Sequence, residues 1–340
     1  MSGLVWQLRS RAELAFARSR AWAVATSGLL VAAMLLSLSQ GAVDLSLTEI
    51  AQSLLDADHP LRIVMWQVRL PRVVCGAMVG TSLAVAGLLL QTTVRNPLAD
   101  PGILGVTAGA GVAALVVVLI FPERVAWMPW AAFLGGLTTI AIVLGLAWTR
   151  DDRVGALRIV LSGVALQAVL FACIGLLTFA FADRAPSFAA FTVGSLGGSG
   201  WGDAQRIALP TALGLAAAGL AIRPLDLLLL DDGTAGGLGL AVRQARWMAA
   251  CIAALLTATA VSVAGLIGFV GLVVPNGMRL LVGPEHRLLM PVTALAGAAL
   301  VLLADTVART TLAPLELPVG AFLALIGGPY FLDLLWKKLS

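Results

Sequence analysis

Charged residues are scarce in this 340-residue chain. Only 12% of the residues are Asp, Glu, Lys or Arg, whereas 60% are hydrophobic and the mean hydropathy is +0.98. A soluble domain carries roughly 25% charged residues. Because the apolar residues fall in runs long enough to cross a bilayer, the composition excludes an ordinary soluble protein. It predicts an all-α polytopic membrane protein.

Lysine is almost absent, which limits the chemistry that the chain can perform alone. The only lysines are Lys337 and Lys338, followed by Leu and Ser, whereas a phosphate-binding P-loop requires Gly-Lys followed by Ser or Thr. The apolar runs also contain no paired carboxylates, no His-Glu-x-x-His motif and no His/Cys/Asp constellation. The sequence therefore predicts that this chain is not an enzyme and does not bind ATP in this manner.

Cysteine and histidine are too few and too scattered for a metal site. His59 and His286 lie far apart in the sequence, and we expect both to be solvated loop residues. The three cysteines all lie within apolar runs: Cys75, Cys173 and Cys251. We therefore expect no disulfide, no metal site and no cofactor in this chain. No basic block exceeds two residues, which argues against nucleic-acid binding.

Ten apolar segments have the length expected of membrane-spanning helices. The first is longer than the core of a signal peptide, so we expect it to remain as an uncleaved helix. If the N-terminus is cytoplasmic, most of the 22 Lys and Arg residues fall on the cytoplasmic side, which predicts that both termini are cytoplasmic. The approximate limits of the spans are 21–38, 73–93, 103–121, 130–148, 157–182, 206–222, 246–265, 267–282, 289–308 and 318–336.

Three connecting loops are long enough to carry function. Residues 39–72 and 183–205 are predicted to be external, and the first contains an amphipathic piece between Leu45 and Leu55. Residues 223–245 are predicted to be cytoplasmic and to form two short helices around a Gly-rich stretch. No separate soluble domain is present, so residues 1–340 are interpreted as a single transmembrane domain.

The most distinctive segment runs from Arg69 to Gly111. An apolar helix of spanning length ends in Arg95-Asn-Pro-Leu-Ala-Asp-Pro-Gly, and a second apolar run follows at once. Prolines restrict the backbone and cannot continue a helix. A rigid, polar, two-proline turn at a membrane boundary is more elaborate than a plain connector requires. We therefore expect this turn to move or to act as a gate.

The predicted spans contain almost no ionisable residues. Secondary transporters driven by ions usually carry such residues deep in the membrane, so this alternative is disfavoured. Asp305 is the main exception, and its position four residues before Arg309 predicts an i,i+4 ion pair. A membrane enzyme or sensor scaffold is also disfavoured, because neither a catalytic cluster nor an output domain is present. A pathway without its own energy source should draw energy from another subunit.

Several separated motifs occur in one order along the chain, and together they resemble a known family. With these motifs, the chain resembles the membrane-spanning permease subunits of binding-protein-dependent ABC importers for iron–siderophores, haem and vitamin B12. The motifs are Arg69-Leu-Pro-Arg72, Arg95-Asn-Pro-Leu-Ala-Asp-Pro-Gly-Ile-Leu-Gly105, Leu161-Ser-Gly-Val-Ala165, Gly194-Ser-Leu with Trp201, Ala235 with Leu238-Gly239, Gly268-Phe-Val-Gly-Leu-Val-Val-Pro275, Gly283 with His286-Arg287, Ala304-Asp305 with Arg309, Glu316-Leu-Pro-Val-Gly320 and Ile326-Gly-Gly-Pro329.

The resemblance implies an architecture and a set of partners. It implies ten transmembrane helices per subunit and a functional dimer of twenty helices in a bacterial inner membrane. The second permease subunit would be identical or different. Two ATPase subunits would hold ATP and Mg on the cytoplasmic side, and a periplasmic or lipid-anchored binding protein would deliver the substrate.

The resemblance also assigns roles to three arginines. Arg69, Arg72 and Arg309 lie at external helix ends in the predicted topology. In the family, arginines at these motif positions meet carboxylates on the binding protein. The planar guanidinium can hold a carboxylate through two parallel hydrogen bonds. Pairing with local acids or lipid head groups is the alternative, and for Arg309 the competing partner is Asp305.

The cytoplasmic loop resembles the segment that contacts the ATPase in this family. Its small residues would allow a helix end to insert closely into a partner, and its two acids could cap a helix N-terminus or meet basic residues of the ATPase. A solvated turn is the alternative. The residues concerned are Asp231, Asp232, Gly233, Thr234, Ala235, Leu238 and Gly239.

Two cytoplasmic turns resemble the inner gate of the family, and two spans resemble its pathway. The fifth and tenth spans should line the pathway, with Ser162, Gln167 and Thr178 as sparse polar points on an apolar wall. Such a wall would hold a bulky chelate weakly enough to release it. The predicted gate residues are Asn96, Pro97, Leu98, Asp151, Asp152 and Arg153.

One position departs from the family pattern. The family commonly has His after the proline of the eighth span, whereas this chain has Asn276. Asn can donate and accept hydrogen bonds but cannot titrate at physiological pH, so a proton-dependent role there is not expected. The residues from Arg95 to Asp100 resemble the siderophore and haem members more than the cobalamin branch. A ferric siderophore is the favoured cargo, haem is the first alternative, and cobalamin or another chelate is the second.

Overall fold

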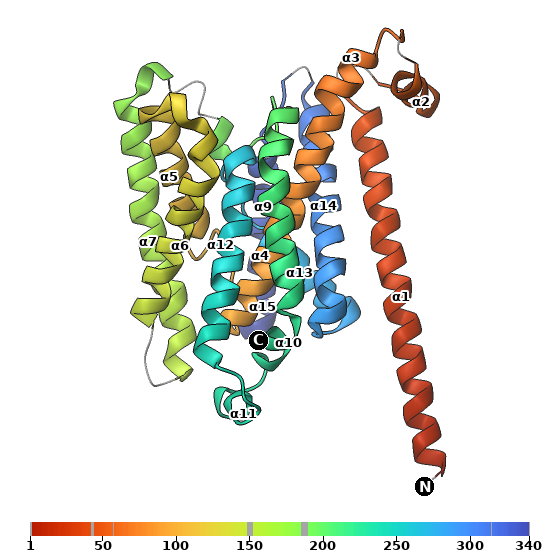
Figure 1. Cartoon of the computed structure of the whole chain (residues 1–340), viewed down its shortest axis with the longest axis vertical. Coiled ribbons are helices and arrows are strands. Elements are labelled where there is room, and N and C mark those ends of the chain that lie inside the picture. Colours follow the sequence, from red (N-terminus) through yellow and green to blue (C-terminus); the bar gives the residue numbers. More distant parts are fainter. Residues whose placement is uncertain are drawn as a thin grey trace.

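The computed structural model describes residues 2–41, 44–56, 58–147, 152–184, 190–313 and 315–339. Within these ranges the regular structure is helical (Figure 1). The N- and C-terminal ends both lie in the lower half of Figure 1, as predicted for an even number of spans. We call the end that carries α2 (Leu47–Leu55) the outer end, and the end that carries α10 (Ile222–Leu227) and α11 (Asp232–Gly237) the inner end.

A helix is present at each of the ten predicted spans. Six helical segments are long and apolar enough to cross a membrane: Ala21–Ser39, Arg62–Val94, Pro122–Leu146, Leu161–Ala180, Val242–Ala264 and His286–Thr311. Shorter apolar helices cover Val106–Ile120, Val270–Val282 and Val319–Pro329. The chain is therefore an all-helical polytopic membrane protein. The ten helices are α1 (Ser2–Ser39), α4 (Leu70–Val94), α5 (Val106–Ile120), α6 (Met128–Ala147), α7 (Asp152–Ala180), α9 (Trp201–Leu220), α12 (Val242–Ala264), α13 (Val270–Val282), α14 (His286–Thr311) and α15 (Val319–Leu339).

The start of the second spanning helix differs from the prediction. α3 (Arg62–Val64), a π-helical turn at Met65–Arg69 and α4 follow one another without a break, so residues 62–72 are helical and not loop. Pro71 explains the π turn, because it lacks an N–H and its ring would collide with the carbonyl four residues earlier. The Leu70 N–H instead donates to the Met65 carbonyl, one residue further back than in an α-helix.

α4 is the central helix of the bundle, and nearly its whole length is buried (Figure 1). It packs against α9, α12, α13 and α14. The backbones approach closely at two glycine pairs, because a Cβ at Gly80 would collide with Gly297 of α14, and one at Gly87 with Gly271 of α13. Small residues at helix crossings permit this close packing in membrane proteins.

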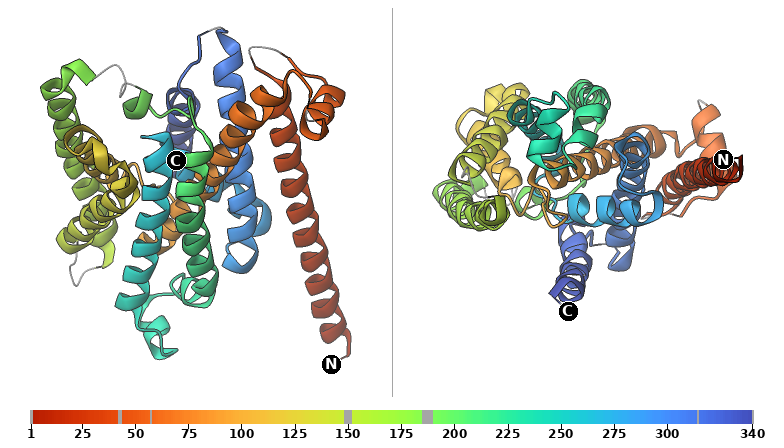
Figure 2. Two further views of the ribbon diagram at one scale, coloured as in Figure 1. Left: turned by 45° about the horizontal axis from the view of Figure 1, so that its top comes forward. Right: turned by 90° about the horizontal axis from the view of Figure 1, so that it is seen from below.

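The other helices surround α4 unevenly. Seen from below in Figure 2, α5, α6 and α7 form a group on one side, α1 lies on the opposite side and α15 projects from the body. The outer faces of α7 and α15 expose large apolar side chains, including Phe179 and Leu325. Such faces suit lipid or another helix rather than water.

Short helices mark the two ends of the bundle. α2 confirms the predicted amphipathic piece, and Ser46 and Glu49 form a capping box at its N-terminus. Two further short elements, η2 (Pro122–Trp127) and η3 (Ala182–Arg184), are 3-10 helices; η2 connects α5 to α6, and η3 follows α7. At the inner end, α10 and α11 are the two short helices predicted within the cytoplasmic loop.

Replacing Gly87 with alanine should destabilise the bundle. The added methyl group would meet the Gly271 backbone, and overpacking of this kind typically costs about 1–3 kcal/mol. Thermal unfolding of the purified protein in detergent should show a lower Tm for Gly87→Ala. Gly175→Ala in α7 is the matched control, because nothing lies within 4 Å of its added Cβ. An equal Tm loss in both variants would contradict the close-packing account.

Candidate functional site

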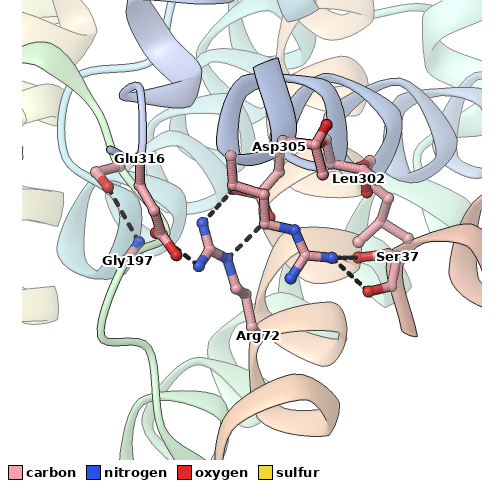
Figure 3. A network of polar contacts seen from close by, with 10 residues as sticks. Ser37, Arg72, Gly197, Leu302, Asp305 and Glu316 are labelled. Atoms are coloured by element: carbon pink, nitrogen blue, oxygen red, sulfur yellow. Dashed lines mark hydrogen bonds and ion pairs between the residues drawn. The ribbon is translucent and has the colours of Figure 1, made fainter. Parts of the chain in front are cut away.

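Arg72 holds a network of charges at the outer end. Its Nε and Nη2 atoms donate to the two carboxylate oxygens of Asp305, each at 2.9 Å, and its Nη1 donates to Glu316 at 2.9 Å (Figure 3). The Asp305 side chain is only 2% exposed, whereas that of Glu316 is 51% exposed. Arg72 therefore joins α4 to α14 and to the loop that precedes α15. Two parallel bonds to one carboxylate give this pair its fixed geometry.

Arg69 and Arg309 bind the last carbonyl groups of α1. Arg69 donates to the carbonyls of Leu38 and Ser39, the latter at 3.1 Å. Arg309 donates to the Ser37 carbonyl and, at 3.1 Å, to its hydroxyl. The last carbonyls of a helix lack partners within the helix and carry partial negative charge, so cations are favoured there.

The predicted ion pair between Asp305 and Arg309 is wrong. Both oxygens of Asp305 accept from Arg72, and Arg309 turns to α1 instead. The i,i+4 spacing does bring the two side chains to one helix face, but the guanidinium of Arg72 offers Asp305 a bidentate contact. The three predicted docking arginines thus lie at one end of the bundle, each buried and bonded within the chain.

The predicted gate turn between α4 and α5 is attached to α13. Asn96 accepts a hydrogen bond from the Leu98 N–H at 3.0 Å, which closes a tight turn. The carbonyl of Pro97 accepts from the side chain of Asn276 at 2.7 Å. Arg95 has a left-handed backbone, with φ of 52°, and ends α4. Asn276, the residue that departs from the family pattern, therefore has a structural role, because its amide group bonds the gate turn to α13.

Asp100 makes a second attachment of this turn to α13. Its carboxylate is buried and accepts from the Gly102 N–H at 2.7 Å. Burial raises the pKa of Asp100 to about 6, while hydrogen bonds from the backbone of Gly102, Ile103 and Leu272 act in the opposite direction. Leu272 belongs to the first turn of α13, where a carboxylate is favoured by the helix dipole.

A polar network beside the gate turn was not predicted. Arg279 of α13 donates to the amide oxygens of Gln91, at 2.9 Å, and Asn276, at 3.0 Å. Gln91 in turn donates to the Gly271 carbonyl at 3.0 Å. The inner halves of α4 and α13 are therefore joined through amide groups. Sequence spacing could not find the contacts of Gln91, because its partners Gly271 and Arg279 lie 180 and 188 residues away.

The predicted ATPase-contact residues form the tip of the inner end. Asp231 caps α11 by accepting from the Thr234 N–H at 2.9 Å, and its hydrogen bonds with Thr234 hold the pKa of Asp231 below its usual value. Ala235 is buried, whereas Leu238 is 62% exposed. Gly233 is exposed, and Gly239 has a positive φ of 85°. The expected helix cap is thus confirmed for Asp231.

Asp232 has partners of its own chain. It accepts hydrogen bonds from Arg246 of α12, at 2.9 Å, and from Arg95.

The surroundings of His286 also differ from the prediction. We expected this histidine to be solvated, but its side chain is only 1% exposed. That expectation was wrong because α10 covers the histidine, with Asp226 hydrogen-bonded to the ring. His59 is half-buried in its loop.

The remaining predicted site residues lie on or before α7. Asp151 lies outside the described residues; Asp152 and Arg153 begin α7. Ser162, Gln167 and Thr178 are half-buried on α7, and Thr178 donates to the carbonyls of Ile174 and Gly175. Within this chain α7 packs mainly on α5 and α6, and α15 on α13 and α14. The two helices predicted to line a pathway thus belong to different parts of the subunit.

Comparison with known proteins identifies the family. A sequence model of the FecCD transport family matches residues 29–337. The chain is 40% identical over 321 residues to a hemin transport system permease protein of Yersinia pestis, which covers 91% of this chain and 93% of the relative. It is 42% identical over 275 residues to a cobalamin import system permease protein of Halobacterium salinarum, which covers 81% of this chain and 73% of the relative.

A solved structure agrees with these relatives. It is described as an inward-facing conformation of a metal-chelate type ABC transporter, and it matches with a TM-score of 0.79 and 32% identity. The match covers 93% of this chain and 98% of that chain.

The chain therefore belongs to the FecCD transport family, the permeases of iron–siderophore, haem and vitamin B12 ABC importers. It is a multi-pass membrane permease subunit and not a catalytic subunit, and such subunits carry no cofactor. Family membership also implies ATPase and binding-protein partners.

Neutralising Asp305 should destabilise the protein far more than neutralising Glu316. Asp305→Asn would leave the buried Arg72 without its main counter-ion, and breaking a buried pair costs about 3–5 kcal/mol. Glu316→Gln removes the negative charge from a half-exposed ion pair, which is typically worth about 0–1 kcal/mol. Thermal unfolding in detergent would measure both. Similar Tm values for the two variants would show that Asp305 is not the main partner.

Proposed function

We propose that this chain is the translocation subunit of an importer that moves a ferric siderophore across a bacterial inner membrane by alternating access. The family makes it a permease of a binding-protein-dependent importer for iron–siderophore, haem or cobalamin. The proposal of alternating access between two partners rests on the different residues at the two ends of the bundle. Buried arginines gather at the outer end, and an exposed apolar tip projects at the inner end.

The cargo is argued from the sequence. Arg95 before Asn96 is typical of the siderophore and haem branches, whereas the cobalamin branch often has an acidic residue there. Haem is the first alternative and cobalamin the second, and the hemin and cobalamin relatives are almost equally similar. In the structure, Arg95 donates hydrogen bonds to the Leu228 carbonyl and to Asp232 of its own chain.

The inner tip is proposed to bind the ATPase. Leu229, Leu230 and Leu238 are exposed there, beside α11. A Cβ at Gly236 or Gly237 would meet nothing within 4 Å, so packing within this chain does not require glycine at these positions. Small residues and exposed leucines suit the close approach of a partner surface. Both termini and this tip are proposed to be cytoplasmic.

The outer end is proposed to bind the substrate-binding protein. Arg69, Arg72 and Arg309 are the docking residues in this proposal, although each is bonded within the chain. Glu316 is the exposed partner of Arg72, so a carboxylate from the binding protein would have to compete with it. Arginine forks favour such carboxylate contacts.

A second permease subunit is proposed to cover the exposed faces of α7 and α15. An apolar groove of about 320 Å³ lies between α13, α14 and α15, with Phe269, Phe322 and Ile326 among its lining residues. All ten helices are proposed to cross the membrane as one domain, which gives twenty helices in the dimer. Ser162, Gln167 and Thr178 would then face the shared pathway, with residues 96–98 and 151–153 as its inner gate.

Reconstitution of the complete importer in proteoliposomes would test the proposal. We expect ATP-dependent uptake of a radiolabelled ferric siderophore that is lost without the ATPase or without the binding protein. Uptake of haem or cobalamin instead would keep the class and overturn the cargo. Uptake by this chain alone, driven by an ion gradient, would favour a secondary transporter and overturn the proposal.

A charge at the inner tip should prevent ATPase binding. Leu238→Asp places a carboxylate in the proposed contact. Removing this carboxylate from water on ATPase binding would cost about 2–5 kcal/mol. Co-purification should then recover less ATPase with this variant. Leu55→Asp is the matched control, because Leu55 is 86% exposed at the outer end. Equal recovery with Leu238→Asp and the control would place the ATPase contact elsewhere.

A further inference from the structure

The inner arm, residues 222–239, is attached to the bundle by side chains from distant parts of the sequence. It contains α10 and α11, and it contacts α4, α12 and α14. Two separate links make these attachments. Both reach the last turn of α4, immediately before the gate turn, and one also reaches the first turn of α14.

The first link is the side chain of Arg95. Its Nε donates to the Leu228 carbonyl at 2.9 Å, between α10 and α11, and its Nη2 donates to Asp232 at the start of α11. Arg246 of α12 shares the same carboxylate at 2.9 Å. Arg95 also ends α4, and Asn96 and Pro97 follow it at once. Arg95 therefore binds the arm and directly precedes the gate turn.

The second link passes through the buried ring of His286. Asp226 of α10 accepts from the His286 backbone N–H at 2.9 Å and lies 2.7 Å from Nδ1. Nε2 lies 2.8 Å from the Thr92 hydroxyl of α4. An ionised carboxylate only accepts, so Nδ1 carries a proton. One ring thus bridges α10 and α4, while Asp226 caps the N-terminus of α14.

We propose that Arg95 and His286 are positioning residues that transmit displacement of the inner arm to the inner ends of α4 and α14. This inference rests on the proposed function, in which the ATPase moves the arm. A displacement of α11 would be transmitted to the gate turn through Asp232 and Arg95. A displacement of α10 would be transmitted to α4 and α14 through His286. The His286 ring and Thr92 are buried, whereas Arg95 and Asp232 are partly exposed. Separating the buried pair would leave polar groups without a partner, so this link resists being pulled apart.

The alternative is that these contacts only stabilise the fold. Both accounts predict that removing a link lowers the Tm. They differ in the number of substrate molecules imported per ATP hydrolysed, because loss of transmission lets the ATPase run without moving the gate. That ratio is the readout that a purely structural role would leave unchanged.

Substitutions at His286 can cut the second link on one side at a time. The amide nitrogen of Asn lies near the position of Nδ1, so His286→Asn keeps the contact with Asp226 and loses Thr92. The amide of Gln lies near Nε2, so His286→Gln does the reverse. Thr92→Val removes only the hydroxyl. These three variants are gentler than truncation to alanine, which would open a cavity in a buried site.

For each variant, we would reconstitute the whole importer with its ATPase and binding protein, and measure uptake and ATP hydrolysis together. We expect His286→Asn, His286→Gln and Thr92→Val to keep ATPase binding but to lower the uptake per ATP by about fivefold or more, the lower end of typical coupling between sites. Arg95→Gln should do the same.

Two controls remove a positive charge without touching a link. Arg287→Gln lies next to His286 and is exposed, and Arg158→Gln lies exposed on α7. We expect both controls to keep the wild-type ratio. An unchanged ratio in all the link variants would overturn this inference alone, and so would loss of ATPase binding in them. Absence of ATP-dependent uptake by the wild-type assembly would instead overturn the proposed function, and the inference with it.

Discussion

The burial of α4 on all sides is the constraint on which the rest of the structure depends. A central helix can approach its neighbours closely only where side chains are small, and Gly80 and Gly87 provide this against α14 and α13. Once α4 is enclosed, every polar group on it needs a partner within the protein. Its charged residues accordingly lie near its two ends, where Arg72 meets Asp305 and Arg95 meets Asp232.

The two ends of α4 therefore carry different kinds of contact. At the outer end, guanidinium groups bind carboxylates and the free carbonyls of α1, which joins helices that are far apart in sequence (Figure 3). At the inner end, Arg95 and Thr92 bind the arm and His286. A helix with side-chain links at both ends provides a physical connection between the two faces at which we propose that the partners bind.

Most of the fold could be predicted because its determinants are local. The ten helices follow from runs of apolar residues, and the Asp231 cap follows from an acid placed before a short helix. The start of α4 was misplaced because Arg69 and Arg72 are charged, and charge ordinarily ends a membrane span. In the structure their guanidinium groups are neutralised or hydrogen-bonded inside the protein, so the helix continues to Arg62.

By itself, the sequence determined the class of protein, the positions of its apolar helices, the placement of both termini toward one end and the two short helices of the inner tip. Hydropathy and capping act over a few residues, so they can be read along the chain. Only the tertiary structure decided that Asp305 pairs with Arg72 and not with Arg309, and that His286 is buried against Asp226. Those contacts join residues 233 and 60 positions apart. Their partners are chosen by how the helices pack, which no local pattern records.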